Sequence, residues 1–180
     1  MSSRPHASPP SPPSSPHGTQ AWLAVVRAYN LCDAVMTTRL ATLGLRVGEH
    51  EVLANLATSP GITQQALAAR CFVAKSGVSM LLTQMEGQGL VRREADAADA
   101  RVRRLFLTPA GAALAAQSLR IQADVVRAMV EPATEAELAA MVDVMGRVST
   151  RLEALRAETD AGLSRASAPR SPPRRPARRG

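Results

Sequence analysis

The stretch that decides the fold runs from residue 61 to residue 111 and reads GITQQALAARCFVAKSGVSMLLTQMEGQGLVRREADAADARVRRLFLTPAG. It opens with two short helical patterns that meet at a break near Cys71–Val73. A glycine-rich exit follows, then a strand, an arginine-rich hairpin tip, a second strand and a Thr-Pro pair that starts another helix. Two short helices joined by a turn and followed by a basic β-ribbon predict a winged helix-turn-helix, an element that reads duplex DNA.

The second helical pattern of this stretch is expected to supply the helix that enters the major groove. It spans about 74–88, and its apolar positions recur at three- and four-residue steps, which predicts one buried side. At its N-terminal end the other residues are small or polar, which suits close approach to base edges in a groove about 12 Å wide. Strands are expected over 90–94 and 102–108, and Thr63 is expected to cap a preceding helix over 64–70.

The rest of the chain predicts a helical framework around this element. Apolar residues make up 46% of the 180 residues and aromatic residues only 2%, so the core must consist of Leu, Val, Ala and Met, which favours helices. We expect a mainly α fold with a small β-wing, in which a winged helix-turn-helix DNA-binding lobe joins a helical dimerisation base. The lobe is expected over 45–108, the base over 19–44 and 109–160, a disordered Pro/Ser-rich head over 1–18 and a disordered Arg/Pro-rich tail over 161–180.

The net charge of +7 is distributed unevenly along the chain. Its surplus lies in arginines of the head and the tail, because the 15 acidic residues, all between Asp33 and Asp160, are matched by 15 basic ones between Arg27 and Arg156. Within 61–108, seven basic residues outnumber four acidic ones, so the winged element is positive while the flanking helices are not. This arrangement is typical of a protein that presents one side to phosphates.

Several other classes of protein are not indicated. The two cysteines, Cys32 and Cys71, form no CxxC motif or His/Cys cluster, so we expect no metal site, disulfide or cofactor. The sequence shows no nucleophile–base pair and no phosphate loop, and we expect no enzymatic activity. It also has no apolar run of ~18–20 residues and no secretory signal, so a cytoplasmic protein without a membrane partner is expected.

The candidate DNA-contacting residues follow the order of the winged element. Ser76 and Ser79 are expected to bond base edges, and Lys75 and Gln84 to reach bases or phosphates. Arginines near the ribbon are expected on the backbone, and Arg101 in the minor groove, whose negative potential favours a guanidinium. Any one of these side chains is equally well explained as a solvated surface residue, but the ordered set favours DNA contact. The whole set is Thr63, Gln64, Gln65, Arg70, Lys75, Ser76, Gly77, Ser79, Met80, Gln84, Arg92, Arg93, Asp99, Arg101 and Arg103.

Five segments of the chain resemble the MarR family of transcription regulators. They are LRVGEHEVL (45–53), ITQQALAAR (62–70), VAKSGVSMLLTQMEGQGLVRR (73–93), the wing triplet Asp99-Ala100-Arg101 and LFLTPAG (105–111). The resemblance implies that Asp99 supports the wing and that Arg101 reads the minor groove. Gly77 and Met80 depart from the pattern, because the family often carries Thr and Arg there, which implies fewer direct base contacts and more indirect readout.

The resemblance also implies a homodimer. In the family the first helix and the last two interlock into a dimer base, and two winged lobes read a pseudo-palindromic operator in double-stranded DNA. Independently, the outer helices of this chain have apolar faces too wide for a monomer of this size to cover. They include Leu114, Leu119, Val125, Val126, Met129, Leu138, Met141, Val142, Met145, Val148 and Leu152.

Members of the family are commonly repressors released by a small aromatic acid bound between the dimer base and the DNA-binding lobe. The candidate ligand-binding residues are Trp22, Tyr29, Arg46 and His50, where His50 and the aromatic residues would hold a ring and a carboxylate. Arg46 would supply charge. A single inward His is more often a satisfied core residue than a ligand, and Trp22 and Tyr29 are likewise more often plain core residues. The segments VVRAYNLCDAVM (25–36) and RCFVAKSGVSMLL (70–82) resemble repressors of nicotinate degradation within the family, which implies hydroxylated nicotinate as the effector.

Two other functions are open on the sequence. Organic-peroxide sensors of the family use a cysteine in the first helix, where Cys32 lies, although Asp33 beside it opposes formation of a thiolate. A winged helix that contacts proteins instead of DNA is the alternative from another class. It predicts weak association with DNA that is insensitive to salt, unlike a regulator that neutralises phosphates.

Overall fold

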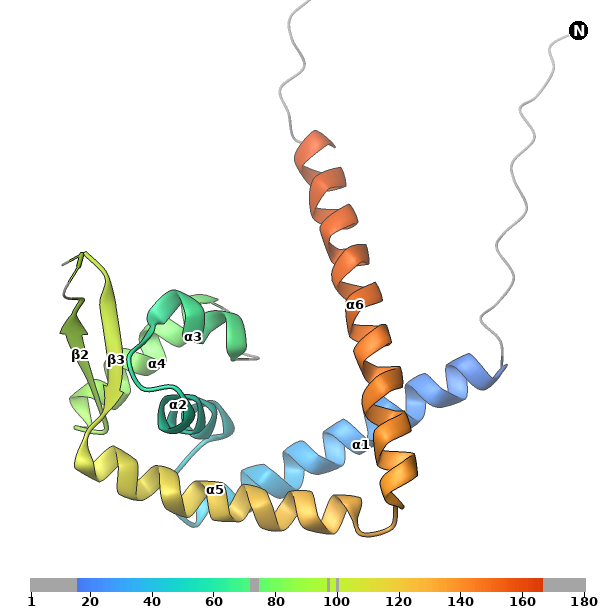
Figure 1. Cartoon of the computed structure of the whole chain (residues 1–180), viewed down its shortest axis with the longest axis horizontal. Helices are drawn as coiled ribbons and strands as arrows, with labels where there is room; N and C mark the ends of the chain where they lie inside the picture. The colour runs from blue at the N-terminus through green and yellow to red at the C-terminus, as the bar shows by residue number, and fades with distance from the viewer. Residues whose placement is uncertain (1–15, 72–74, 97, 100, 167–180) are drawn as a thin grey trace, which may run out of the picture. The chain divides into compact units, whose positions relative to one another are not determined.

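The computed structural model describes residues 16–71, 75–96, 98–99 and 101–166, and the side chains of 17–71, 77–96, 98–99 and 101–163. The chain divides into two compact units, Met1–Met129 and Val130–Gly180. The first contains α1 (Pro16–Ala41), α2 (Val47–Thr58), β1 (Ile62–Thr63), α3 (Gln64–Arg70), α4 (Lys75–Gly87), β2 (Val91–Ala95), β3 (Arg103–Leu107) and α5 (Pro109–Val130) (Figure 1). The second contains α6 (Glu135–Ala166). The predicted fold class, mainly helical with a small β-wing, is confirmed.

The core of the first unit gathers around α2, α4 and the sheet. In α4, Val78, Leu82 and Met85 are fully buried and Leu81 is half-buried, so the predicted apolar side of this helix is the side that packs. Each fully buried side chain of this kind stabilises the fold by roughly 1.5–3 kcal/mol. Because one side of α4 is committed to the core, its other side remains exposed to solvent.

The sheet has three antiparallel strands in the order β1-β3-β2. β2 and β3 form the predicted hairpin, with Val91 opposite Leu107, and we call residues 91–107 the wing. The sequence does not predict β1, in which Ile62 pairs with Leu105. A strand of two residues is too short to show the alternation by which strands are recognised.

The junction between the wing and α5 is fixed by close backbone contacts. The Thr108 hydroxyl donates to the Gly89 carbonyl at 2.6 Å and accepts from the Gly111 amide at 3.0 Å. The Thr108 amide donates to the Leu90 carbonyl at 3.0 Å. A Cβ added at Gly111 would lie only 1.9 Å from the Leu90 carbonyl oxygen. The T-x-x-G motif of the sequence therefore has a packing reason, since only glycine permits this approach.

The outer helices extend further than predicted. α1 begins at Pro16, inside the predicted head, and α6 continues to Ala166 instead of ending near Glu158. Residues 161–166, which were assigned to the disordered tail, are therefore helical. No proline interrupts this segment before Pro169, so no proline ends the helix near Glu158. The remainder of the predicted head and tail, 1–15 and 167–180, lies outside the described residues.

Among the described residues of the first unit, only the C-terminal part of the apolar stripe on α1 is buried. Met36 and Leu40 join the core and Cys32 packs against it. In contrast, Trp22 and Tyr29 are 62% and 66% exposed. The stripe predicted from periodicity is present, but most of it is left uncovered. In the described part of the chain, no helix combines the length and hydropathy needed to cross a membrane.

We expect Gly111→Ala to lower the free energy of unfolding by about 1–3 kcal/mol, because the added methyl group meets a backbone carbonyl that has little room to move. Urea titration followed by circular dichroism measures this change. Gly87→Ala is the matched control, since a Cβ there meets nothing within 4 Å and should leave the stability nearly unchanged. A Gly111→Ala protein as stable as the wild type would contradict the packing argument.

Candidate nucleic-acid interface

The side of α4 that faces away from the core carries residues predicted to contact DNA. The exposed or half-buried ones are Gly77, Ser79, Met80 and Gln84. Met80 is 75% exposed, which is unusual for a large apolar side chain. Lys75 and Ser76 lie in the first turn of α4, but their side chains fall outside the described residues. The described side chains of this surface are therefore all uncharged.

The short helix α3 precedes α4 and begins with a capped turn. The Thr63 hydroxyl accepts a hydrogen bond from the Ala66 amide at 3.2 Å, which is the predicted helix cap. Gln64 is half-buried and Gln65 is exposed. Of the residues predicted on this helix, Gln65 thus has the greatest freedom to reach a phosphate.

Two aspartates organise the tip of the wing. Asp99 accepts a hydrogen bond from the Arg101 amide at 2.9 Å, so it holds the backbone that presents Arg101 to solvent. Asp96, which was not among the predicted residues, accepts from the amides of Ala98 at 2.8 Å and Asp99 at 3.2 Å. It also pairs with the Arg104 guanidinium. These bonds, led by the one from Ala98, hold the pKa of Asp96 below its ordinary value. An aspartate at the start of a turn was the available sequence signal.

The arginines of the wing point in different directions. Arg93 pairs with Glu86 of α4 at 2.8 Å. Its neighbour Arg92 lies on the opposite side of the strand, with its guanidinium 4.8 Å from the centre of the Phe106 ring, and pairs with Glu94. The two were predicted together as backbone contacts, but they do not share a surface. Arg101 and Arg103 are both exposed.

Arg46, Glu49 and Gln84 form a closed ring of hydrogen bonds between α2 and α4. Glu49 accepts from the Arg46 amide at 2.8 Å, from Arg46 Nη2 at 3.1 Å and from Gln84 Nε2 at 3.0 Å. Arg46 Nη2 also donates to Gln84 Oε1 at 2.8 Å. The sequence assigned Arg46 to an effector and Gln84 to DNA, whereas the structure brings these two side chains together. Glu49, which joins them, was not predicted as a functional residue.

A pocket of about 270 Å³ lies beside His50 in the first unit, and we call it the His50 pocket. It is lined by Met36, Val47, His50, Glu51, Ala54, Asn55, Arg70 and Gln122. His50 is 4% exposed, and its Nδ1 has no hydrogen-bond partner among the described residues. Burial lowers the pKa of His50, and a hydrogen bond with Gln122 acts in the opposite direction. The imidazole is therefore neutral at pH 7.

The four predicted ligand residues are not gathered in one place. Of these, only His50 lines the His50 pocket. Trp22 and Tyr29 lie on the exposed part of α1, and Arg46 lies in the ring next to α4. Arg70, which was predicted to contact the DNA backbone, also lines this pocket. The cation of this pocket is thus supplied by the end of α3.

The two cysteines differ in burial. Cys71 is buried, and burial raises the pKa of its thiol, with a smaller contribution from the charge of Glu51. Cys32 is half-buried against the core. Among the described residues, no three His, Cys, Asp or Glu side chains are grouped in a way that suits a metal ion.

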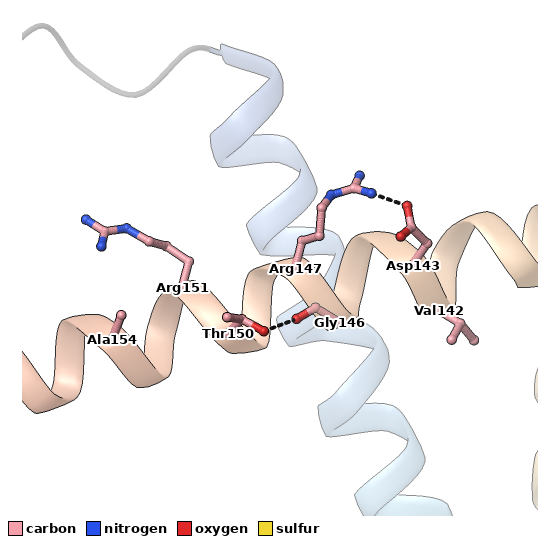
Figure 2. Close-up of a pocket in the computed structure, with 7 residues that line it drawn as sticks. All are labelled: Val142, Asp143, Gly146, Arg147, Thr150, Arg151 and Ala154. Atoms are coloured by element: carbon pink, nitrogen blue, oxygen red, sulfur yellow. Dashed lines mark hydrogen bonds and ion pairs between the residues drawn. The ribbon is translucent and has the colours of Figure 1, made fainter.

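The second unit has a shallow groove of about 550 Å³ along α6 (Figure 2). Its lining residues are Val142, Asp143, Gly146, Arg147, Thr150, Arg151 and Ala154. Figure 2 shows Arg147 turned toward Asp143, with which it forms an ion pair. The Thr150 hydroxyl donates to the Gly146 carbonyl at 3.1 Å. All lining residues come from one helix and these polar groups are already paired, so the groove lacks the convergent polar groups of a ligand site.

Comparison with known proteins gives one family. Residues 43–102 match the model of the MarR family. The transcriptional regulator HosA of Escherichia coli O157:H7 is 40% identical over 73 residues, which are 41% of this chain and 54% of HosA. This chain therefore spans about half the length of the curated relatives that it matches.

Two crystal structures share the fold. AbsC, a MarR family transcriptional regulator from Streptomyces coelicolor, has a TM-score of 0.74 at 23% identity, covering 80% of this chain and 99% of AbsC. A mutant of E. coli MarR complexed with operator DNA has a TM-score of 0.65 at 20% identity, covering 73% of this chain and 95% of that one. At these identities the likeness concerns the fold alone.

The family match falls on the part of the chain that forms the helix pair and the first strand of the wing. The two crystal structures extend the likeness to the helices outside that match. Residues 43–102 are thus similar in sequence to the MarR family, and the fold is the winged-helix fold of the MarR structures.

Proposed function

We propose that this chain binds double-stranded DNA and regulates transcription. The observation that carries the proposal is the exposed side of α4 together with a wing whose tip presents Arg101. A helix of this kind enters the major groove, while a guanidinium on the wing reaches the adjacent minor groove. The operator DNA bound to the structurally similar E. coli MarR supports this reading. Arg70 and Arg92 have the weakest support as contacts, because other groups of this chain engage them.

We further propose a homodimer that reads a pseudo-palindromic operator. Large apolar side chains are exposed on both α1 and α6. They include Trp22, Leu23, Val25, Val26, Tyr29 and Leu31 on α1, and Met141, Val142, Val148, Leu152 and Leu155 on α6. Exposed apolar area of this extent marks an interface. A second copy supplies the same surfaces, so a two-fold symmetric contact covers both at once.

The His50 pocket is proposed as the site of a small aromatic acid that releases the regulator from DNA. Its volume of about 270 Å³ is suited to a single ring. Arg70 donates through Nη1 to the Ser59 hydroxyl and has further donors for a carboxylate. Neutral His50 offers a nitrogen that accepts a hydrogen bond from a ring hydroxyl. A hydroxylated nicotinate has both groups. Trp22, Tyr29 and Arg46, which were also predicted, have no part in this pocket.

Release follows if the effector and DNA favour different arrangements of the lobe. His50 lines the pocket, and the preceding residue, Glu49, holds α4 through Gln84. A ligand that shifts this turn of α2 changes the position of the helix that reads DNA. Only a difference in the ligand's affinity for the two arrangements produces release, and DNA weakens the ligand by the same factor.

The alternatives have less support. A redox response through Cys32 needs an accessible thiolate, but this side chain is half-buried against the core. A winged helix used for protein contacts would not need the positive excess of the segment 61–108. The curated relatives are described as regulators, and we propose no enzymatic role. The regulator is placed in the cytoplasm, with the DNA that it reads.

We expect Arg101→Ala to weaken binding to a duplex taken from directly upstream of the protein's own gene. One lost contact should lower the affinity roughly tenfold and the salt dependence by about one counterion. Fluorescence anisotropy over a series of KCl concentrations measures both. Arg120→Ala, which removes an exposed arginine of α5, is the control and should leave the affinity nearly unchanged. Weak binding that neither salt nor Arg101→Ala changes would contradict DNA regulation and favour the protein-interaction module.

The homodimer is tested on α6 with Leu152→Glu, which puts a charge on the exposed apolar side. We expect the variant to sediment as a monomer, because desolvating the new carboxylate opposes association. Ala154→Glu is the matched control, since two residues place it about 200° around the helix. Analytical ultracentrifugation distinguishes the species. A Leu152→Glu protein that remains a dimer would exclude this side of α6 from the interface.

The effector site is tested by the melting temperature of the DNA-free protein. We expect 6-hydroxynicotinate to raise the melting temperature of the wild type and to lose this effect in His50→Gln, because a bound ligand stabilises only the native state. His17→Gln changes an exposed histidine on α1 and should respond as the wild type does. An equal shift in His50→Gln would place the ligand elsewhere. No shift with any aromatic acid would remove the effector from the proposal.

A further inference from the structure

The helix α4 carries little positive charge, because the one cation of its sequence is Lys75 in the first turn. From Gly77 to Gly87 its sequence contains no Lys or Arg. A cation lies next to it, however, on the residue before α2. The Arg46 guanidinium bonds to Gln84 of α4 at 2.8 Å. It also lines a groove of about 260 Å³ with Gly77, Met80 and Leu81, which are all residues of α4.

We propose that Arg46 binds a DNA phosphate at the edge of α4, and that Glu49 and Gln84 are the positioning residues that hold it there. This inference rests on the proposed DNA-binding function. It assigns Arg46 a partner other than the effector that the sequence favoured. It also assigns Gln84 a role within the protein in place of a base contact.

The ring holds the guanidinium at one nitrogen and leaves the rest of it exposed. The Arg46 side chain is 69% exposed, whereas that of Glu49 is 4% exposed. Both bonds from the guanidinium to Glu49 and Gln84 use Nη2. Among the described residues, Nε and Nη1 of Arg46 have no hydrogen-bond partner. A guanidinium carries five donors in a planar fork that fits a phosphate, so the free donors are those available to DNA.

The buried carboxylate explains why the fork is held in place. A buried, ionised carboxylate is costly unless several donors satisfy it. Glu49 has three such donors, two from Arg46 and one from Gln84. Rotating Arg46 away would leave part of Glu49 unsatisfied inside the protein. The guanidinium therefore meets DNA with little further loss of side-chain freedom, which favours a defined contact over a diffuse charge.

The first test is Arg46→Gln, which keeps an amide donor for Glu49 but removes the charge. A phosphate contact contributes about 0.9 to the slope of log affinity against log salt, so the loss should be about eightfold near 0.1 M salt and should vanish near 1 M. The loss should be equal on the upstream duplex and on an unrelated duplex, because a phosphate carries no sequence information. Fluorescence anisotropy provides both affinities.

Arg127→Ala is the matched control. Arg127 is also an exposed arginine in an i,i+3 ion pair, but it lies on α5. The Arg127→Ala protein should bind both duplexes with nearly the affinity of the wild type. An equal loss in Arg127→Ala would assign the effect to net charge and overturn the proposed contact. If the wild type binds neither duplex, the DNA-binding function itself fails. If it binds with steep salt dependence and Arg46→Gln is unchanged, only this inference fails.

The positioning role is tested with Glu49→Gln. The amide still accepts a hydrogen bond at the start of α2, but it cannot satisfy all three donors. This variant loses one negative charge, so a purely electrostatic role of Arg46 predicts tighter binding of DNA. A positioned contact predicts weaker binding and a lower salt slope, and tighter or unchanged binding would overturn it. Should Glu49→Gln unfold, Gln84→Met is the second variant. It removes only the hydrogen bonds of the exposed Gln84 amide to Arg46 and Glu49, and it should also weaken DNA binding.

A free carboxylate has the same chemistry as a phosphate, and a DNA-free experiment separates the two. Benzoate should change the melting temperature of the wild type and of Arg46→Gln equally, whether or not it binds elsewhere. A benzoate shift that Arg46→Gln abolishes would assign the guanidinium to a small anion and overturn the proposal.

Discussion

The buried carboxylate of Glu49 is the constraint on which the position of α4 depends. It lies inside the protein and accepts hydrogen bonds from Arg46 at the start of α2 and from Gln84 of α4. Loss of either donor would leave a buried carboxylate without a full set of partners. Since α2 is anchored in the core by Val52, Leu53 and Leu56, the carboxylate fixes α4 to a rigid support. The exposed side of α4 is therefore presented as a surface of defined orientation.

The same turn of α2 also reaches the His50 pocket. Glu49 and His50 are adjacent in sequence. The Glu49 side chain accepts a hydrogen bond from Gln84 of α4, and the His50 side chain lines the pocket. His50 stays neutral because burial disfavours its charged form, so it accepts or donates a hydrogen bond without bringing a second charge near Glu49. Coupling between a ligand and DNA needs a physical connection with two arrangements, and one turn of helix is the shortest connection available.

The sequence predicted those features that depend on local pattern. The buried stripe of α4, the Thr63 cap and the wing hairpin follow from periodicity and capping. What it missed depends on contacts between distant residues. The ring joins residues 35 to 38 positions apart, and Arg104 donates to the Gly61 carbonyl across 43 positions. Periodicity carries no information about such pairs, so the pairing of Arg46 with Gln84 was not foreseen. Asp96 was overlooked for another reason, because its partners are close in sequence and only the turn pattern marks it.

The rigidity of the lobe limits how regulation can work. Gly111 of α5 packs against Leu90 just before the wing, Arg93 of the wing pairs with Glu86 of α4, and β3 pairs with β1, so the wing is joined to three other elements of the lobe. Two such lobes in the proposed dimer read successive grooves only when their spacing matches one helical turn of DNA. Little is left to adjust inside the lobe except the turn of α2 beside the His50 pocket. In the proposed regulation, an effector there would act either by tilting α4 through Glu49 or by shifting the whole lobe, and only the first route would pass through Arg46.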